Sequence, residues 1–186
     1  LSGATDLRPL VQRAALGGTL RGEELRELYD TLVIFRKVRS TLAPLKEFPQ
    51  LSSLAASLPD LKPLEQELAL AVDTDGALLD GASKDLKPRR DRAREAHHIL
   101  METLERAVRR LSRTKVLQES LITERSGRLV LLIKSEMRHR VPGIVHDVSD
   151  SGATAFIEPL PAIPLGNQWK EASLAVQREE DRILQI

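Results

Sequence analysis

Apolar residues recur at three- or four-residue steps along the first half of the chain, which is the period of an amphipathic helix. A short helix is predicted from Asp6 to Ala15, and a longer one from about Gly22 to Leu42. Pro44 ends the second pattern, because the residue before a proline disfavours the helical conformation. One face of the longer helix is apolar, and we expect it to be buried. It consists of Leu25, Leu28, Leu32, Phe35 and Val38.

The longest predicted helix begins near Asp85 and continues to about Gln118. Pro88 is compatible with it, because a proline in the first turn removes only an amide that has no helical acceptor. At about 1.5 Å per residue such a helix is about 50 Å long. It is longer than a helix that only packs on a small globular core, so we expect it to act as a rigid connecting element, a strut. A shorter helix precedes it, from Asp60 as N-cap to about Val72.

After Ile122 the pattern changes to extended, β-prone stretches separated by turn-rich segments. They predict a small antiparallel meander. Its strands are expected at Leu129–Ile133, Val141–Val148 and Ala153–Pro159. Asn167 is the expected N-cap of a final helix. One side of that helix carries Trp169, Ala172, Val176 and Ile183.

The order of these elements predicts a mainly α-helical fold with a small antiparallel β insertion. We expect the final helix to lie against the long one, with the β part at the tip of the helical pair. Three parts are predicted: a helical region over 1–121, a β-rich insertion over 122–166 and a returning helix over 167–186. The chain begins with Leu1 rather than Met and ends within a helical pattern, so we expect it to be a piece of a longer protein.

Composition and charge exclude few functions. The 28 basic and 27 acidic residues give a net charge of +1, so only the distribution of charge can indicate a nucleic-acid partner. The sequence has no cysteine, which removes disulfides and thiolate chemistry and fits a reducing, cytoplasmic setting. No apolar run approaches the roughly 20 residues needed to span a bilayer, so no membrane association is expected.

Four arginines on the long predicted helix form the first candidate nucleic-acid-binding group. Their i, i+3, i+4, i+7 spacing places them nearly opposite the leucines of the same helix. They are Arg106, Arg109, Arg110 and Arg113. Guanidinium groups donate paired hydrogen bonds to phosphate oxygens and remain charged at cellular pH. The alternative is a solvated helix face, on which Glu102 and Glu105 pair with Arg106 and Arg109.

A second basic group lies in and after the first predicted strand. It consists of Lys134, Arg138, His139 and Arg140. A turn there could present several cations to a phosphate backbone. The alternative is an edge strand whose basic residues block aggregation. Aromatic residues make up only 3% of the chain, so we expect contacts to backbone and shape rather than base stacking.

The sequence offers no candidate catalytic, cofactor-binding or metal-binding residues. His97 and His98 are adjacent on a helix and point about 100° apart, which does not let both bind one metal. A further group matches no known ligand spacing: His146, Asp147, Asp150 and Glu158. Phosphate-binding loops of the GxxxxGK(S/T) type and GxSxG elbows are absent from the sequence. The chain itself is therefore not expected to be an enzyme.

Three sequence blocks resemble the MutS-two family. They are ITERSGR at 122–128, VPGIVHD at 141–147 and SGATAFIEP at 151–159. Upstream, DLRPLVQRA before Gly17 and Gly18 is also similar, as is the pattern formed by Asp75, Gly76, Asp80, Ala82 and Ser83. The resemblance therefore covers essentially the whole chain. The sequence departs from the family at Pro88, Leu131, Leu132 and Asp150.

The resemblance implies a dimeric bacterial MutS-like protein that lacks the mismatch-reading domain. It also implies an ATPase module and usually a C-terminal Smr nuclease module, neither of which lies in this chain. Family members are associated with branched DNA and suppression of homologous recombination, and some with splitting collided ribosomes. In MutS-like folds this region supplies the core and lever helices, here 1–121 and 167–186, and the β-rich clamp, here 122–166.

Several hypotheses follow. The preferred one is a non-catalytic module that grips duplex or branched DNA, with Lys134, Arg138 and Arg140 as phosphate contacts and the arginines of the long helix as secondary ones. A second is a structural arm that couples the dimer to the absent ATPase, with solvated basic residues. A third is a surface for the ribosome or its RNA, which uses the same charges. An intrinsic hydrolase or nuclease has the least support.

Overall fold

The structure, a computed structural model, describes residues 5–185, so the predicted helix end at Ile186 lies outside the described residues. The chain forms two compact units. One comprises the residues up to Lys87 together with those from Gln177 onward, and the other is Pro88–Val176. None of the helices that the structure describes is long and apolar enough to cross a membrane.

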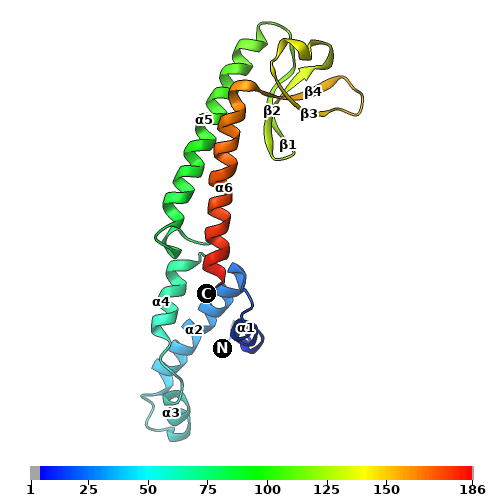
Figure 1. The fold of residues 1–186 in the computed structure, drawn as a ribbon. Coiled ribbons are helices and arrows are strands. Elements are labelled where there is room, and N and C mark those ends of the chain that lie inside the picture. Colours follow the sequence, from blue (N-terminus) through cyan, green and yellow to red (C-terminus); the bar gives the residue numbers. More distant parts are fainter. Residues whose placement is uncertain (1–4, 186) are drawn as a thin grey trace. The chain divides into compact units, whose positions relative to one another are not determined.

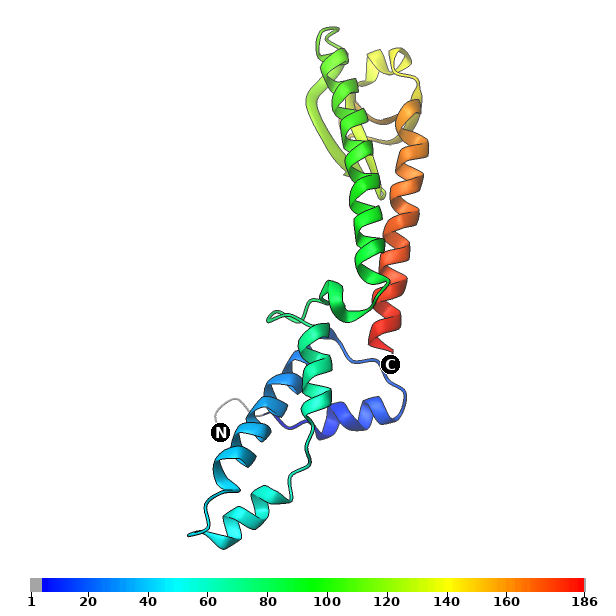
Figure 2. The same ribbon diagram turned by 90° about the vertical axis from the view of Figure 1, so that its left-hand side faces the viewer.

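The first unit is built from short helices around one longer helix. Its elements are α1 (Arg8–Ala15), α2 (Gly22–Leu42), α3 (Pro49–Ala56), α4 (Lys62–Ala71), the short 3-10 helix η1 (Asp80–Ala82) and the end of α6 (Ile163–Leu184). Helices α2 and α4 lie side by side (Figure 2), and Arg36 Nε on α2 is 2.8 Å from Glu65 Oε2 on α4. On α6, Glu179 Oε1 accepts a hydrogen bond from Ser83 Oγ at 2.7 Å.

The apolar face predicted for α2 is buried only in part. Leu32 is buried, whereas Phe35 is 40% exposed. Leu25, Leu28 and Val38 are half-buried. Helices α3 and α4, which pack on α2, have 8 and 10 residues and cannot cover all 21 residues of α2. The apolar pattern does not predict helix α3, whose first turn holds Pro49, a position where proline is tolerated.

An ion pair holds α1 against the start of α2. The Arg13 guanidinium contacts the Glu24 carboxylate, which also accepts the backbone N–H of Arg21 at 2.8 Å. The side chain of Glu24 is only 11% exposed. The hydrogen bond from Arg13, and next that from Arg21, lower the pKa of Glu24 to about 2.

The second unit contains two long helices and a sheet. Helix α5 (Leu86–Ser112) has 27 residues, which corresponds to about 40 Å. Within this unit α5 and α6 run side by side in opposite directions (Figure 1). Arg89 Nη1 donates to the Ala175 carbonyl at 3.3 Å, and the His97 and Trp169 ring centroids are 5.0 Å apart. The predicted return of the final helix onto the long one is confirmed for this unit.

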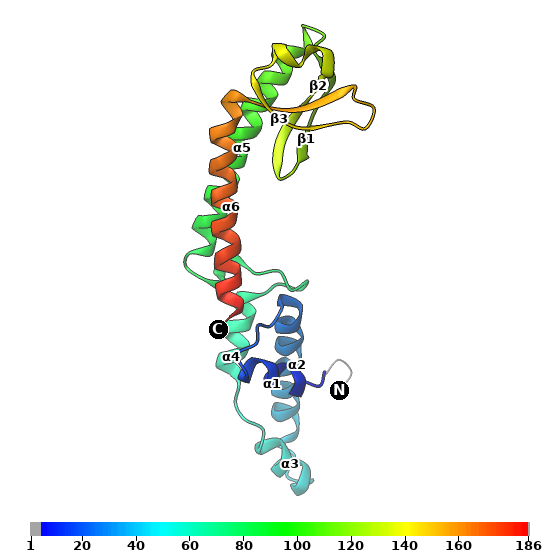
Figure 3. The same cartoon turned by 45° about the vertical axis from the view of Figure 1, so that its right-hand side comes forward.

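The sheet has four antiparallel strands, which confirms a mainly α fold with a small β insertion (Figure 3). They are β1 (Leu117–Arg125), β2 (Arg128–Lys134), β3 (Gly143–Val148) and β4 (Thr154–Pro159), in the order β1-β2-β4-β3. The predicted simple meander is wrong, because β4 lies between β2 and β3. The 3-10 helix η2 (Ser135–Arg140) connects β2 to β3, which lies at an edge of the sheet and not next to β2. On this edge strand the side chains of Ile144 and Val145 are 46% and 44% exposed.

Two predicted boundaries of the long elements are also wrong. Helix α5 ends at Ser112 rather than Gln118, because Lys115 adopts a φ of 57° that turns the chain into β1. The sheet therefore begins before residue 122. Helix α6 begins at Ile163, directly after the 3-10 helix η3 (Leu160–Ala162), so Asn167 is not its N-cap.

Strands β2 and β4 bury side chains on both faces of the sheet with a period of two. One face carries Leu131, Ile133 and Ile157. It belongs to a core cluster that includes Leu100, Leu104 and Leu111 of α5. The opposite face forms a smaller cluster of Val130, Leu132 and Phe156. The Arg125 guanidinium lies 4.4 Å from the centre of the Phe156 ring. The main core thus joins the sheet to α5.

The ion pair of Glu24 predicts a pH-dependent stability. Because its folded pKa of about 2 lies below the usual carboxyl value, its contribution is present above that usual value and is lost as pH falls through about 2. We expect Glu24→Gln to lower the melting temperature at neutral pH, and the difference from wild type to vanish near pH 2. Thermal melts followed by circular dichroism over this range test it. Glu27→Gln, an exposed change on the same helix, is the control and should have little effect at any pH.

Candidate nucleic-acid interface

The four arginines predicted on the long helix are all exposed, but only Arg106, Arg109 and Arg110 lie on α5. Arg113 follows the end of α5 at Ser112. Arg109 Nη1 lies 3.5 Å from Glu105 Oε2, which confirms one ion pair of the solvated-face interpretation. Arg106 donates instead to the Glu102 carbonyl at 3.2 Å and to Thr103 Oγ1 at 3.0 Å, while Glu102 is 3.7 Å from His98. Within residues 5–185, Arg106, Arg110 and Arg113 form no ion pair.

The second basic group lies around η2. Lys134 is the last residue of β2 and is half-buried, whereas Arg138, His139 and Arg140 are exposed in the last turn of η2. Strand β2 is central, between β1 and β4, so the edge-strand explanation of Lys134 is wrong. The structure describes no acidic side chain paired with any of these four residues.

Arg110 and Arg140, one from each predicted group, line the same groove of about 240 Å³. Its apolar lining comprises three prolines and four other residues: Pro142, Pro159, Pro161, Ala107, Leu111, Val141 and Leu160. We call it the proline-lined groove. An adjoining groove of about 530 Å³ shares Arg110, Pro159 and Pro161 and adds Arg106. The structure thus brings together three of the eight predicted residues, while Arg109, Arg113, Lys134, Arg138 and His139 do not line either groove.

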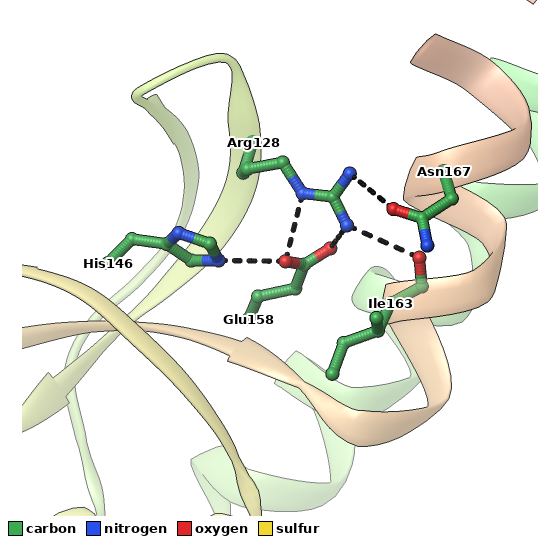
Figure 4. Close-up of polar contacts among 5 residues, drawn as sticks. All are labelled: Arg128, His146, Glu158, Ile163 and Asn167. Atoms are coloured by element: carbon green, nitrogen blue, oxygen red, sulfur yellow. Dashed lines mark hydrogen bonds and ion pairs between the residues drawn. The ribbon is translucent and has the colours of Figure 1, made fainter. Parts of the chain in front are cut away.

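A buried carboxylate holds the segment that forms the groove. Glu158, just before Pro159, is 1% exposed, and Arg128 donates to both of its oxygens, at 2.5 and 3.0 Å (Figure 4). His146 Nε2 lies 2.8 Å from Glu158 Oε2. Arg128 also donates to Asn167 Oδ1 at 2.9 Å and to the Ile163 carbonyl at 3.2 Å. This network, which we call the Glu158 network, ties β2, β3 and β4 to the first turns of α6.

Gly166 provides the space that this network needs. A Cβ on Gly166 would lie 2.8 Å from Glu158 Oε1, closer than real Cβ contacts, and 3.0 Å from Arg128 Nη2, tighter than most of them. Either side chain could move aside only by disturbing its buried hydrogen bonds. The glycine is therefore required by packing, although it lies in a helix, where glycine is usually unfavourable.

The sequence does not predict the role of these residues. Its patterns indicate a helix cap at Asn167 and a group of metal-binding residue types at His146, Asp147, Asp150 and Glu158. Only His146 and Glu158 come together, while Asp147 Oδ2 lies 3.8 Å from Arg125. Among the described residues, no group of three or more His, Cys, Asp or Glu side chains could hold a metal ion. One signal in the sequence could have indicated the network: Glu158 is a charged residue in an otherwise apolar strand, and a buried charge requires an oppositely charged or hydrogen-bonding partner.

Comparison with known proteins finds no matching family model. Curated proteins named Endonuclease MutS2 match the whole chain. The protein of Geobacillus sp. (strain WCH70) is 37% identical over 99% of this chain, that of Thermomicrobium roseum 35% over 100%, and that of Pelotomaculum thermopropionicum 39% over 98%. The chain spans 24%, 24% and 23% of the length of these relatives, respectively.

Removing Arg128 should be strongly destabilising. Arg128→Met leaves Glu158 buried without its main partner, and breaking a buried pair in this way costs about 3–5 kcal/mol of unfolding free energy. The double variant Arg128→Met, Glu158→Leu should recover part of the loss, because no charge then remains buried. Urea titrations measure both. Arg94→Ala, which breaks the exposed pair with Asp91, is the control, with an expected cost of at most about 1 kcal/mol.

Gly166→Ala should lower stability even though alanine favours helices by about 1 kcal/mol over glycine. The added methyl group must displace Glu158 or Arg128 from their hydrogen bonds. Unfolding of the variant in urea gives the sign. Ser173→Ala, at a half-buried site on the same helix, controls for helix propensity. A more stable Gly166→Ala variant would contradict the packing role.

Proposed function

We propose that this chain is a segment of a MutS-two protein that binds nucleic acid through the two adjoining grooves and catalyses no reaction itself. The similarity of this whole chain to a segment of proteins named Endonuclease MutS2 supports the assignment to that family. The relatives' name supports a nucleic-acid substrate for the whole protein. In this proposal the β-rich part, which begins at Leu117 rather than at residue 122, acts as the clamp, and the helices before and after it act as core and lever.

The observation that carries the proposal is the set of arginines on the groove walls. Arg110 comes from α5 and Arg140 from η2, and neither has an acidic partner within residues 5–185. Exposed arginines without partners favour a polyanion, because guanidinium groups donate paired hydrogen bonds to phosphate oxygens. Arg106 continues the row along the adjoining groove. Lys134, Arg138, His139, Arg109 and Arg113 would contribute long-range attraction rather than groove contacts.

Further proposals concern the whole protein. We propose that its ATPase and Smr nuclease modules lie outside this chain, that it works as a cytoplasmic homodimer, and that it acts on branched or duplex DNA to suppress recombination. Binding of ribosomes or their RNA would use the same arginines, since both offer phosphate backbones. For this segment, no cofactor is proposed.

A second candidate is a structural arm that transmits movement between modules. The Glu158 network favours it, because a buried, fully hydrogen-bonded ion pair joins the sheet rigidly to α6. A rigid connection of this kind is compatible with nucleic-acid binding. The two candidates differ in whether the groove arginines matter for binding.

Charge reversal of the groove arginines tests the proposal. We expect Arg110→Glu with Arg140→Glu to lower the affinity for a DNA duplex by at least about tenfold at low salt. The slope of log K against log salt should also fall by about 0.9 for each phosphate that the variant no longer neutralises. Fluorescence anisotropy titrations at several salt concentrations measure both quantities.

Lys170→Glu, an exposed change on α6 outside both grooves, is the matched control and should alter affinity much less. A salt-independent affinity, or equal reductions in the control and the double variant, would refute groove binding. In that case the structural arm would be the better account.

A further inference from the structure

We infer that the proline-lined groove receives a single unpaired nucleobase, so that the site prefers nucleic acid with an interrupted base stack over a continuous duplex. This inference rests on the proposed nucleic-acid binding and specifies which feature of the nucleic acid the site selects. It depends on three observations: a rigid apolar side chain, the two cations beside it, and the size of the groove.

Leu160 is the apolar side chain. It is 55% exposed and stands between Pro159 and Pro161, whose rings fix their backbone φ angles. Its own N–H donates to the Pro142 carbonyl at 3.0 Å, which ties the segment to the start of β3. The Leu160 backbone is thus already ordered, so a ligand that contacts the side chain loses little free energy in fixing it.

Two guanidinium groups flank this apolar surface from different elements. Arg110 reaches the groove from α5 and Arg140 from η2. A purely apolar ligand would not need them, and a lone phosphate would gain nothing from the prolines and Leu160. A nucleotide combines both chemistries, because its base is a flat ring of low charge and its backbone carries phosphates on either side. The groove volume of about 240 Å³ suits one such ring rather than a stack of several.

The selected base should be unpaired because of the cost of extracting a paired one. Taking a base out of a continuous duplex costs a few kcal/mol, and the cost is least where the base already lacks a partner. The groove lacks an aromatic ring, so the base would pack against the apolar side chains of Leu160 and the prolines rather than stack on a ring.

The test compares three labelled DNA duplexes of the same sequence: a continuous one, one with a single unpaired adenine, and one whose unpaired position lacks the base. The full 186-residue chain should bind the adenine-bulged duplex about five- to tenfold more tightly than the continuous one, because the base buries apolar surface in the groove. The abasic bulge should lack this gain, because it keeps the flexibility but not the base. The same three duplexes made of RNA show whether the preference extends to ribose, and a base-dependent preference in either backbone supports the inference.

Variants at the groove separate this inference from the proposed function. Leu160→Ala should reduce the ratio of bulged to continuous affinity toward one, and the conservative Leu160→Met should restore it. Leu174→Ala, an exposed leucine on α6 outside the groove, should leave the ratio as in wild type. Equal binding of all three duplexes, or an undiminished ratio in Leu160→Ala, overturns the inference while duplex binding through the arginines stands. Failure to bind any duplex overturns both.

Discussion

The burial of the Glu158 carboxylate is the constraint on which the candidate site in the second unit depends. An ionised carboxylate removed from water must be compensated, and here two bonds from Arg128 and one contact with His146 provide that compensation. Because these partners come from β2 and β3, and Arg128 also bonds to α6, the requirements of one charge fix four elements at once. Gly166 is part of the same constraint, since a larger residue would occupy the space of the ion pair.

The groove depends on this constraint through chain connectivity. Pro159 and Leu160 follow Glu158 directly, so their position depends on a side chain that is buried and hydrogen-bonded. The opposite walls are formed by α5, which the main core attaches to the sheet, and by η2. Arginines that are far apart in sequence therefore meet around a rigid apolar segment. This geometry supports the proposed function better than either basic group does alone.

Much of the fold could be predicted because helical periodicity is a strong local signal. Helix α2, the return of α6 onto α5 and the presence of a small antiparallel sheet follow from apolar spacing and β-prone runs. The end of α5 could not be predicted, because Val116 and Leu117 are apolar residues that suit a helix as well as a strand. The strand order could not be predicted from the sequence either, since the path of η2 depends on tertiary packing.

The site was predictable only in part. Clusters of arginine are visible in the sequence, so both basic groups were identified, but their meeting at one groove requires the folded chain. The prolines that line the groove are uncharged and follow no helical or strand period, so the sequence does not indicate their place in a site. The ion pair between Glu158 and Arg128 could not be predicted, because spacing along the chain does not show which residues meet in the fold.

Strand β3 has a further consequence. As an edge strand with Ile144 and Val145 exposed, it offers unsatisfied amide and carbonyl groups beside apolar side chains. Such an edge is a template for another extended chain, and Asp147 is the acidic charge in the strand that opposes this. Concentrated samples of the isolated chain therefore carry a tendency to associate edge to edge, which the charge of Asp147 limits.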